Sequence, residues 1–169
     1  MQNQRGFSLL ELLVVVVIIG LIAAIAVPNM LAARRAANEG SSVSALRTLY
    51  SANVSFAATV GNGNYAGTAG VVGISALSDL ASARLIDKVL ETGEKSGYLY
   101  VGNRIEETAT TSETFYFASN PSTPSGLVMT GTKRYGVATD GVIRFDASSP
   151  LLAVPLDEVT IPAATAVEN

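Results

Sequence analysis

The stretch RGFSLLELLVVVVIIG, residues 5–20, begins an apolar run that continues to Val27. Across residues 7–27 the polar side chains are those of Ser8 and Glu11. A helix of this length is about 30 Å long, which matches the hydrocarbon thickness of a bilayer. A carboxylate at the centre of such a helix costs about 2.5–3.5 kcal/mol of insertion free energy. The stretch therefore predicts a membrane-spanning helix in which Glu11 is retained for a function.

The composition of the whole chain bounds its class. Its 169 residues suffice for one domain with an appendage, and the net charge of −3 provides no positive field for nucleic acids. Cysteine and histidine are both absent, which excludes thiol nucleophiles, disulfides, the usual zinc sites and the commonest general base. An enzyme would have to rely on Ser, Lys, Asp or Glu. We expect no enzyme, no cofactor and no metal site.

Two general interpretations of the apolar run compete with a specialised one. It could be a plain membrane anchor, or it could be a secretory signal. A signal is favoured by the basic Arg5 and by Ala24-Ile25-Ala26, a small-x-small cleavage candidate just before Val27-Pro28. Glu11 argues against a signal, because the central region of a signal peptide is purely apolar.

The short polar head of residues 1–6 is followed at once by Phe7-Ser8-Leu9-Leu10-Glu11. This resembles the prepilin leader of type IV pilins and type II secretion pseudopilins, a G-F-[ST]-L-[IL]-E pattern ahead of a long apolar helix. Pro28 falls where this family commonly has a proline. The resemblance implies that a prepilin peptidase cleaves between Gly6 and Phe7 on the cytoplasmic side of the inner membrane and then N-methylates Phe7.

The resemblance also implies how such a subunit assembles. The apolar segment, residues 7–28, stays on the mature protein, crosses the inner membrane once and later packs in the centre of the filament. Glu11 then pairs with the Phe7 amine of a neighbouring subunit. An internal ion pair is the alternative, because Phe7 and Glu11 lie four residues apart on one helix face.

Three further residues of this segment are predicted to shape the helix for assembly. Gly20 and Ala24 lie one turn apart and would let adjacent helices approach closely. Pro28 lacks an amide hydrogen, so the bond to the Ala24 carbonyl is lost and a kink is expected. In filaments of this family, the stretch between such a glycine and such a proline can unwind.

The helix is expected to continue to Thr59, so that residues 7–59 form one long element. Apolar residues recur at intervals of three and four beyond the membrane segment and mark one face that needs a partner sheet. These residues are Val43, Leu46, Tyr50, Val54 and Ala57.

Residues 60–169 are predicted to form a globular α+β head. A second helix is expected over residues 74–91, and strands over 98–101, 113–118, 133–138 and 142–146, with a type I′ hairpin turn at Asp140-Gly141. The tail, residues 147–169, is either an irregular flap over the sheet or partly disordered. The fold class is therefore α+β: a long N-terminal helix on a small antiparallel sheet, with a short second helix. This order resembles a pilin head.

Two clusters of charged residues are candidate binding sites. Four acidic residues near the C-terminus match no compact calcium loop: Asp140, Asp146, Asp157 and Glu158. Five basic residues could bind DNA but are more typical of a solvated surface: Lys88, Lys95, Arg104, Lys133 and Arg134. Pseudopilin heads commonly carry an aromatic-Gly-x-Pro-Tyr segment, and pilins often have a C-terminal disulfide. The chain lacks both features, which leaves the subfamily open.

The leading hypothesis from the sequence is the major subunit of a type IV pilus, or fimbrium. Its expected partners are identical subunits in a helical filament, the prepilin peptidase, an inner-membrane assembly platform and, before assembly, the membrane itself. Its expected final location is the extracellular pilus. The alternatives are a pseudopilin of a type II secretion system, an exported soluble protein with a cleaved signal, and a membrane-anchored enzyme.

Overall fold

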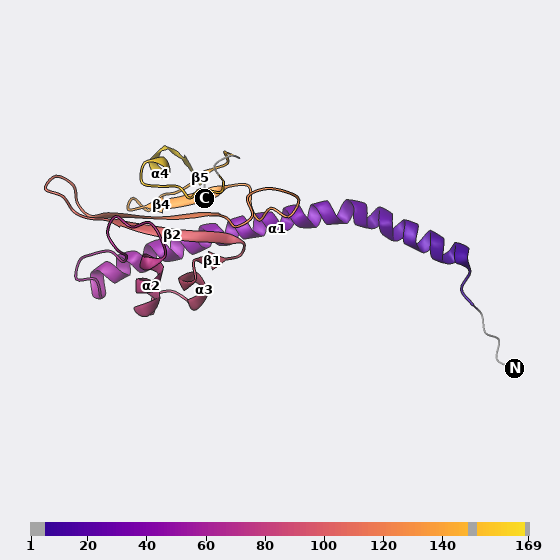
Figure 1. Ribbon diagram of the computed structural model, residues 1–169, viewed down its shortest axis with the longest axis horizontal. Helices are drawn as coiled ribbons and strands as arrows, with labels where there is room; N and C mark the ends of the chain where they lie inside the picture. The colour runs from indigo at the N-terminus through magenta and orange to yellow at the C-terminus, as the bar shows by residue number, and fades with distance from the viewer. Residues whose placement is uncertain (1–5, 149–151, 168–169) are drawn as a thin grey trace. The chain divides into compact units, whose positions relative to one another are not determined.

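The computed structural model describes residues 6–148 and 152–167 (Figure 1). The chain divides into two compact units, residues 1–34 and 35–169. One helix, α1 (Leu9–Thr59), contributes residues to both units. Residues 1–5 of the predicted leader lie outside the described residues.

The described part of the first unit is almost entirely helical. Helix α1 continues without interruption through Gly20 and Pro28, so the missing Pro28 amide does not end it. Unwinding between these two residues in a filament stays a prediction. Among the described residues, α1 is the one helix that is long and apolar enough to cross a membrane, judged by length and composition. The long apolar helix expected from the sequence is confirmed.

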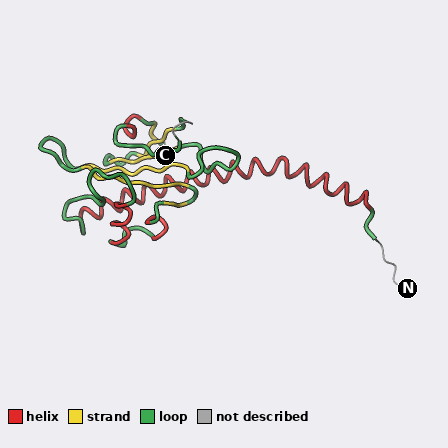
Figure 2. The backbone as a smooth tube through the Cα atoms, in the orientation of Figure 1, coloured by secondary structure: helices red, strands yellow, loops and turns green. Residues whose placement is uncertain are grey.

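The second unit combines the rest of α1 with a six-stranded sheet (Figure 2). Every neighbouring pair of strands is antiparallel, and the strands follow one another in sequence order from β1 to β6. The elements after α1 are α2 (Ser75–Ser82), α3 (Lys88–Glu91), β1 (Glu94–Lys95), β2 (Tyr98–Ile105), β3 (Thr114–Pro121), β4 (Arg134–Ala138), β5 (Ile143–Asp146), α4 (Thr160–Ala163) and β6 (Thr165–Ala166). The predicted α+β fold is confirmed.

The sheet is covered on both faces, which explains why the central strand β3 is buried along nearly its whole length. On one face, Leu46 and Leu49 of α1 pack with Phe115 and Phe117 of β3 and with Tyr98 of β2. On the other face the C-terminal segment packs Leu156 and Ile161 against Tyr116 and Ala118. Figure 1 shows the two layers, with α1, α2 and α3 on one side of the sheet and α4 on the other.

The predicted apolar face of the second half of α1 is only partly correct. Leu46 is fully buried, but Val54 is 43% exposed. The buried face also carries two polar residues, Ser42 and Asn53. The Ser42 and Ser119 hydroxyl oxygens lie 2.7 Å apart, and the Asn53 Oδ1 accepts a hydrogen bond from the Ala66 amide at 2.9 Å. These partners let polar side chains occupy positions that a hydrophobic pattern assigns to the surface.

The single helix predicted over residues 74–91 is wrong, because two short helices occupy this range. Between them Arg84 has a φ of 58°, a left-handed conformation that ends α2. Asp87 then begins α3, and its carboxylate accepts a hydrogen bond from the Leu90 amide at 2.8 Å. An aspartate at this position is a typical helix N-cap.

The hairpin between β4 and β5 is confirmed, but its predicted type I′ turn is wrong. That turn needs positive φ at both central residues, whereas Gly141 has a φ of 73° and Asp140 is not among the positive-φ residues. Instead the Gly141 amide donates to the Ala138 carbonyl at 2.9 Å, and Asp140 Oδ1 accepts from the Val142 amide at 3.0 Å. The described part of the C-terminal segment forms a flap with its own helix and strand, α4 and β6.

Candidate functional site: the processing and assembly segment

The predicted cleavage site lies just before α1. Phe7 is 80% exposed, and a Cβ placed on Gly6 would meet no atom within 4 Å. The Gly6 φ is not in the left-handed region. The fold of the isolated chain therefore does not require a glycine at this position. A requirement for glycine must come from a partner that binds this segment, as a protease cleft does.

Helix α1 begins with a reciprocal pair of side-chain contacts. The Ser8 hydroxyl accepts a hydrogen bond from the Leu10 amide at 3.3 Å, and the Glu11 Oε2 accepts one from the Ser8 amide at 3.4 Å. This is a capping box, in which Ser8 and Glu11 satisfy amides that have no partner within the helix. This role of Ser8 was not predicted, although the Ser-x-x-Glu spacing signals it. Glu11 therefore has a local function in addition to its predicted pairing with Phe7.

The predicted assembly residues Gly20, Ala24 and Pro28 lie on a helix that the described residues of its own unit leave uncovered. The large apolar side chains between Phe7 and Met30 are 45–82% exposed. A Cβ placed on Gly20 would also meet nothing within 4 Å. Exposed apolar surface costs roughly 25 cal/mol per Å² relative to burial. This segment therefore requires lipid or other helices around it.

Three of the four acidic residues that are candidates for calcium, Asp140, Asp146 and Asp157, are each engaged by different partners. Asp140 pairs with Arg144, Asp146 pairs with Arg134, and Asp157 accepts from the Val159 and Thr160 amides. The Thr160 amide and hydroxyl hold the pKa of Asp157 below its usual value. Within residues 6–148 and 152–167, no three metal-ligating side chains come together.

Four of the five basic residues considered for DNA have contacts within the head. Lys95 pairs with Asp87 at 3.3 Å, and Arg104 pairs with Glu113 at 2.7 Å. The Lys133 ammonium lies 4.5 Å from the centroid of the Phe145 ring. The fourth, Arg134, is buried. Each of the four side chains therefore contacts a different partner within the head.

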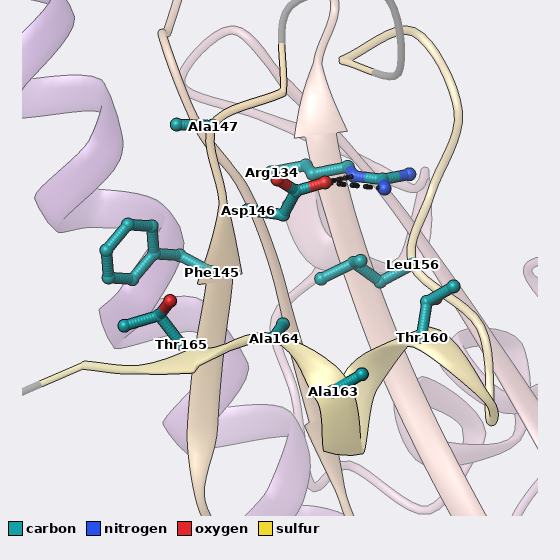
Figure 3. A pocket seen from close by; sticks show the side chains of 9 residues that line it. All are labelled: Arg134, Phe145, Asp146, Ala147, Leu156, Thr160, Ala163, Ala164 and Thr165. Atoms are coloured by element: carbon teal, nitrogen blue, oxygen red, sulfur yellow. Dashed lines mark hydrogen bonds and ion pairs between the residues drawn. The ribbon is translucent and has the colours of Figure 1, made fainter.

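Arg134 has a structural function under the C-terminal flap. Its guanidinium donates to one Asp146 oxygen from Nε at 2.9 Å and from Nη2 at 2.6 Å, and to the Val154 carbonyl from Nη1 at 3.0 Å. Figure 3 shows this pair beside Leu156, at the edge of a hollow of about 390 Å³, whereas Phe145 points toward α1. Arg134 thus fastens the flap to β4 and β5.

Comparison with known proteins gives this segment a family. The family model described as the prokaryotic N-terminal methylation motif matches residues 1–27. In this N-terminal segment the chain is similar to type IV pilins and to type II secretion pseudopilins. The match covers the leader and most of the apolar segment, including Gly6, Phe7 and Glu11, and leaves the head unmatched. No solved structure matches the chain significantly.

Three relatives show how far the similarity extends. The type IV wide pilus major component of Thermus thermophilus is 54% identical over 39 residues, which is 23% of this chain and 30% of that protein. The type IV major pilin of Myxococcus xanthus is 43% identical over 54 residues, 32% of this chain and 24% of that protein. The type II secretion system core protein G of Klebsiella pneumoniae is 47% identical over 49 residues, 29% of this chain and 35% of that protein. The chain spans about a third or less of the length of these relatives.

Proposed function

We propose that the chain is the major structural subunit of a type IV pilus. In this proposal it is cleaved between Gly6 and Phe7, N-methylated at Phe7 and polymerised through α1. The observation that carries the proposal is a processing motif joined to a helix whose apolar side chains lie uncovered. Such a helix needs lipid around it before assembly and other helices around it afterwards. The choice of a pilus is supported by the 54% identity to the Thermus wide-pilus component.

The proposal includes partners and locations. The prepilin peptidase and an inner-membrane assembly platform act while α1 crosses the inner membrane once, and identical subunits then surround α1 in an extracellular filament. We propose that the chain is structural and not an enzyme, a proposal that the absence of histidine and cysteine supports. Nucleic acid is not among the proposed partners.

Glu11 would set the register of assembly. A carboxylate is costly alone in lipid and becomes stabilised when a cationic partner arrives. The Phe7 amine of an incoming subunit would supply that cation. A helix with a smooth apolar surface could slide along its neighbour, whereas one buried charge pair specifies a single stagger. The capping contact with the Ser8 amide would orient the carboxylate before the partner binds.

Gly6→Leu tests the processing step. The substitution should block cleavage, because the protease cleft must accept the backbone before the cut without a side chain. Mass spectrometry of the chain from membranes should then find the full leader in place of N-methyl-Phe7. Gly40→Leu is the matched control, since Gly40 lies far along α1 from the predicted cleavage site and a Cβ there also meets nothing within 4 Å. Mature-length protein from the Gly6 variant would refute the leader assignment.

A secretion pseudopilin is the second candidate function. It is favoured by the 47% identity to core protein G of Klebsiella over 49 residues. Deletion of the gene distinguishes the two. Loss of sheared surface filaments with normal protein secretion supports a pilus. Loss of secretion of folded proteins, with surface filaments unchanged, supports a pseudopilus.

A further inference from the structure

The two ends of strand β3 carry loops of opposite character. The loop before β3, residues 106–113, contains three glutamates and no large apolar side chain. The loop after β3, residues 122–132, contains no charged residue, and at its tip Leu127 is 88% exposed and Val128 is 70% exposed. Since β3 has eight residues, the two loops are separated by about 26 Å along the strand. The head therefore has one acidic end and one apolar end.

The apolar loop is fastened to the part of α1 that enters the head. The Asn38 side-chain amide donates to the Thr130 carbonyl at 3.0 Å. Glu39 Oε1 accepts from both the amide and the hydroxyl of Thr132, each at 2.7 Å. The loop is also closed on itself, because the Thr130 amide donates to the Thr123 carbonyl at 3.0 Å. Leu127 is therefore presented on an ordered loop.

The acidic loop lies at the other end of the helix. The Glu113 carboxylate accepts from the amide of Tyr65, a residue shortly after the end of α1, at 2.9 Å. The apolar loop therefore contacts α1 at Asn38 and Glu39, on the side of the head where the preceding residues of α1 continue toward the predicted membrane segment. Asn38 lies eleven residues after Val27, which is about 16 Å of helix and no more than about 40 Å of extended chain.

We propose that the loop of residues 122–132 is a lipid-contacting surface, which inserts Leu127 and Val128 into the headgroup region of the bilayer while the subunit is membrane-anchored. The proposal rests on the membrane-anchored state of the proposed function. Two exposed side chains are too small for a stable protein interface, which buries more than about 1,000 Å². They suit shallow insertion, in which apolar side chains enter the boundary between headgroups and acyl chains. Arg34 and Arg35 follow the membrane segment, at a position from which basic side chains reach headgroups.

A single labelled cysteine tests this contact, because the natural chain contains no cysteine. Leu127→Cys, labelled with an environment-sensitive fluorophore, is reconstituted as the full chain in phospholipid vesicles that carry a nitroxide near the headgroup. Thr110→Cys, on the exposed acidic loop, is the matched control. We expect the nitroxide lipid to quench the label at 127 at least about twofold more strongly than the label at 110, since insertion reaches about 5–10 Å into the interface.

Equal quenching at the two positions would overturn the proposal. A second result would also overturn it: the nitroxide lipid leaves the label at 127 unquenched, but the label becomes protected from an aqueous quencher as protein density rises. The loop would then contact another copy of the chain. Extraction of the vesicles with alkaline carbonate is done first. If carbonate releases the chain from the vesicles, the membrane-anchored state itself is contradicted. If the chain stays in the vesicles but the label at 127 is exposed to water, only the contact between the loop and lipid is contradicted.

Discussion

The two halves of helix α1 are both rich in apolar side chains, yet among the described residues only the second half is buried within its own unit. In the second half, Leu46 and Leu49 are fully buried against the sheet. In the first half, Leu9 is 82% exposed and Ile22 is 61% exposed. The first half is apolar around its whole circumference, whereas the second half has one buried face. A helix that is apolar all round is typical of a membrane span or a large core.

This difference separates two sources of stability within one helix. The second half contributes to a core that the chain completes by itself. In the proposed function, the first half is covered only when lipid or neighbouring subunits surround it. Changes in the two halves should therefore have separable effects, on folding of the head and on membrane association or assembly respectively.

Removal of residues 1–31 should produce the largest change. We expect loss of membrane association and a soluble, monomeric, folded head, because both core clusters lie beyond residue 41. Size-exclusion chromatography with light scattering and circular dichroism measure the two properties. An aggregated or unfolded fragment would show that the second unit depends on the first.

Glu11→Val should abolish or sharply reduce filaments while it leaves membrane insertion and cleavage after Gly6 intact. The lost carboxylate removes the proposed partner of the incoming Phe7 amine. It also relieves an insertion cost that is at most about 2.5–3.5 kcal/mol, the value for a charge at the helix centre, because Glu11 lies near the start of the apolar run. Sheared surface filaments are imaged, and the membrane fraction is blotted for processed subunit.

Glu11→Gln separates the two roles of this residue. Glutamine keeps an oxygen that can accept from the Ser8 amide, as a capping box allows, but it carries no charge. We expect filaments to be lost as in the Val variant. Normal filaments from the Gln variant would assign Glu11 to capping and remove the charge pair from the assembly mechanism.

Leu49→Ala and Leu13→Ala compare the same substitution in the two halves of α1. Leu49 is fully buried, so its truncation should lower the free energy of unfolding of the head by about 2–5 kcal/mol. Leu13 is 55% exposed, and its truncation should change that free energy by less than about 0.5 kcal/mol. Thermal unfolding of the full chain in detergent, followed by near-ultraviolet circular dichroism, measures both. Equal losses would show that the halves are coupled.

Alkaline pH should destabilise the head by a smaller amount. Burial raises the pKa of Tyr100 to about 12 and also raises the pKa values of Tyr98 and Tyr135. An unfolded tyrosine ionises near pH 10, so the stabilisation is complete below that pH and is lost as the pH rises toward the folded pKa. At about pH 11 the loss is about 1.4 kcal/mol for each buried tyrosine.

Phenolate absorbance during unfolding checks this expectation. All six tyrosines lie at position 50 or later, so the signal reports on the head alone. Tyr100→Phe removes one of these buried groups and should make the alkaline loss smaller. An alkaline loss that is unchanged in this variant would contradict the contribution of Tyr100.

The features predicted correctly from the sequence are those encoded by neighbouring residues. The motif around Gly6 and Glu11 is contiguous, and the length of the apolar run defines a possible membrane span without reference to the rest of the chain. The hairpin at Asp140-Gly141 is likewise local, although its turn type was not predictable because Asp140 can adopt more than one backbone conformation. The order of a long helix followed by antiparallel strands was sufficient for the α+β class.

The tertiary structure decided which polar side chains are buried, because their burial depends on partners that are distant in sequence. Ser42 is buried because Ser119, far along the chain, accepts or donates its hydrogen bond, and Asn53 is buried because the loop at Ala66 folds back onto it. Arg134 leaves the surface because Asp146 and the Val154 carbonyl satisfy its guanidinium. Burial of a polar side chain depends on whether a partner meets it, which a local pattern does not encode. For the apolar half of α1 the sequence alone determined that a cover is needed, since residues 7–27 are apolar on every face of the helix except at Ser8 and Glu11.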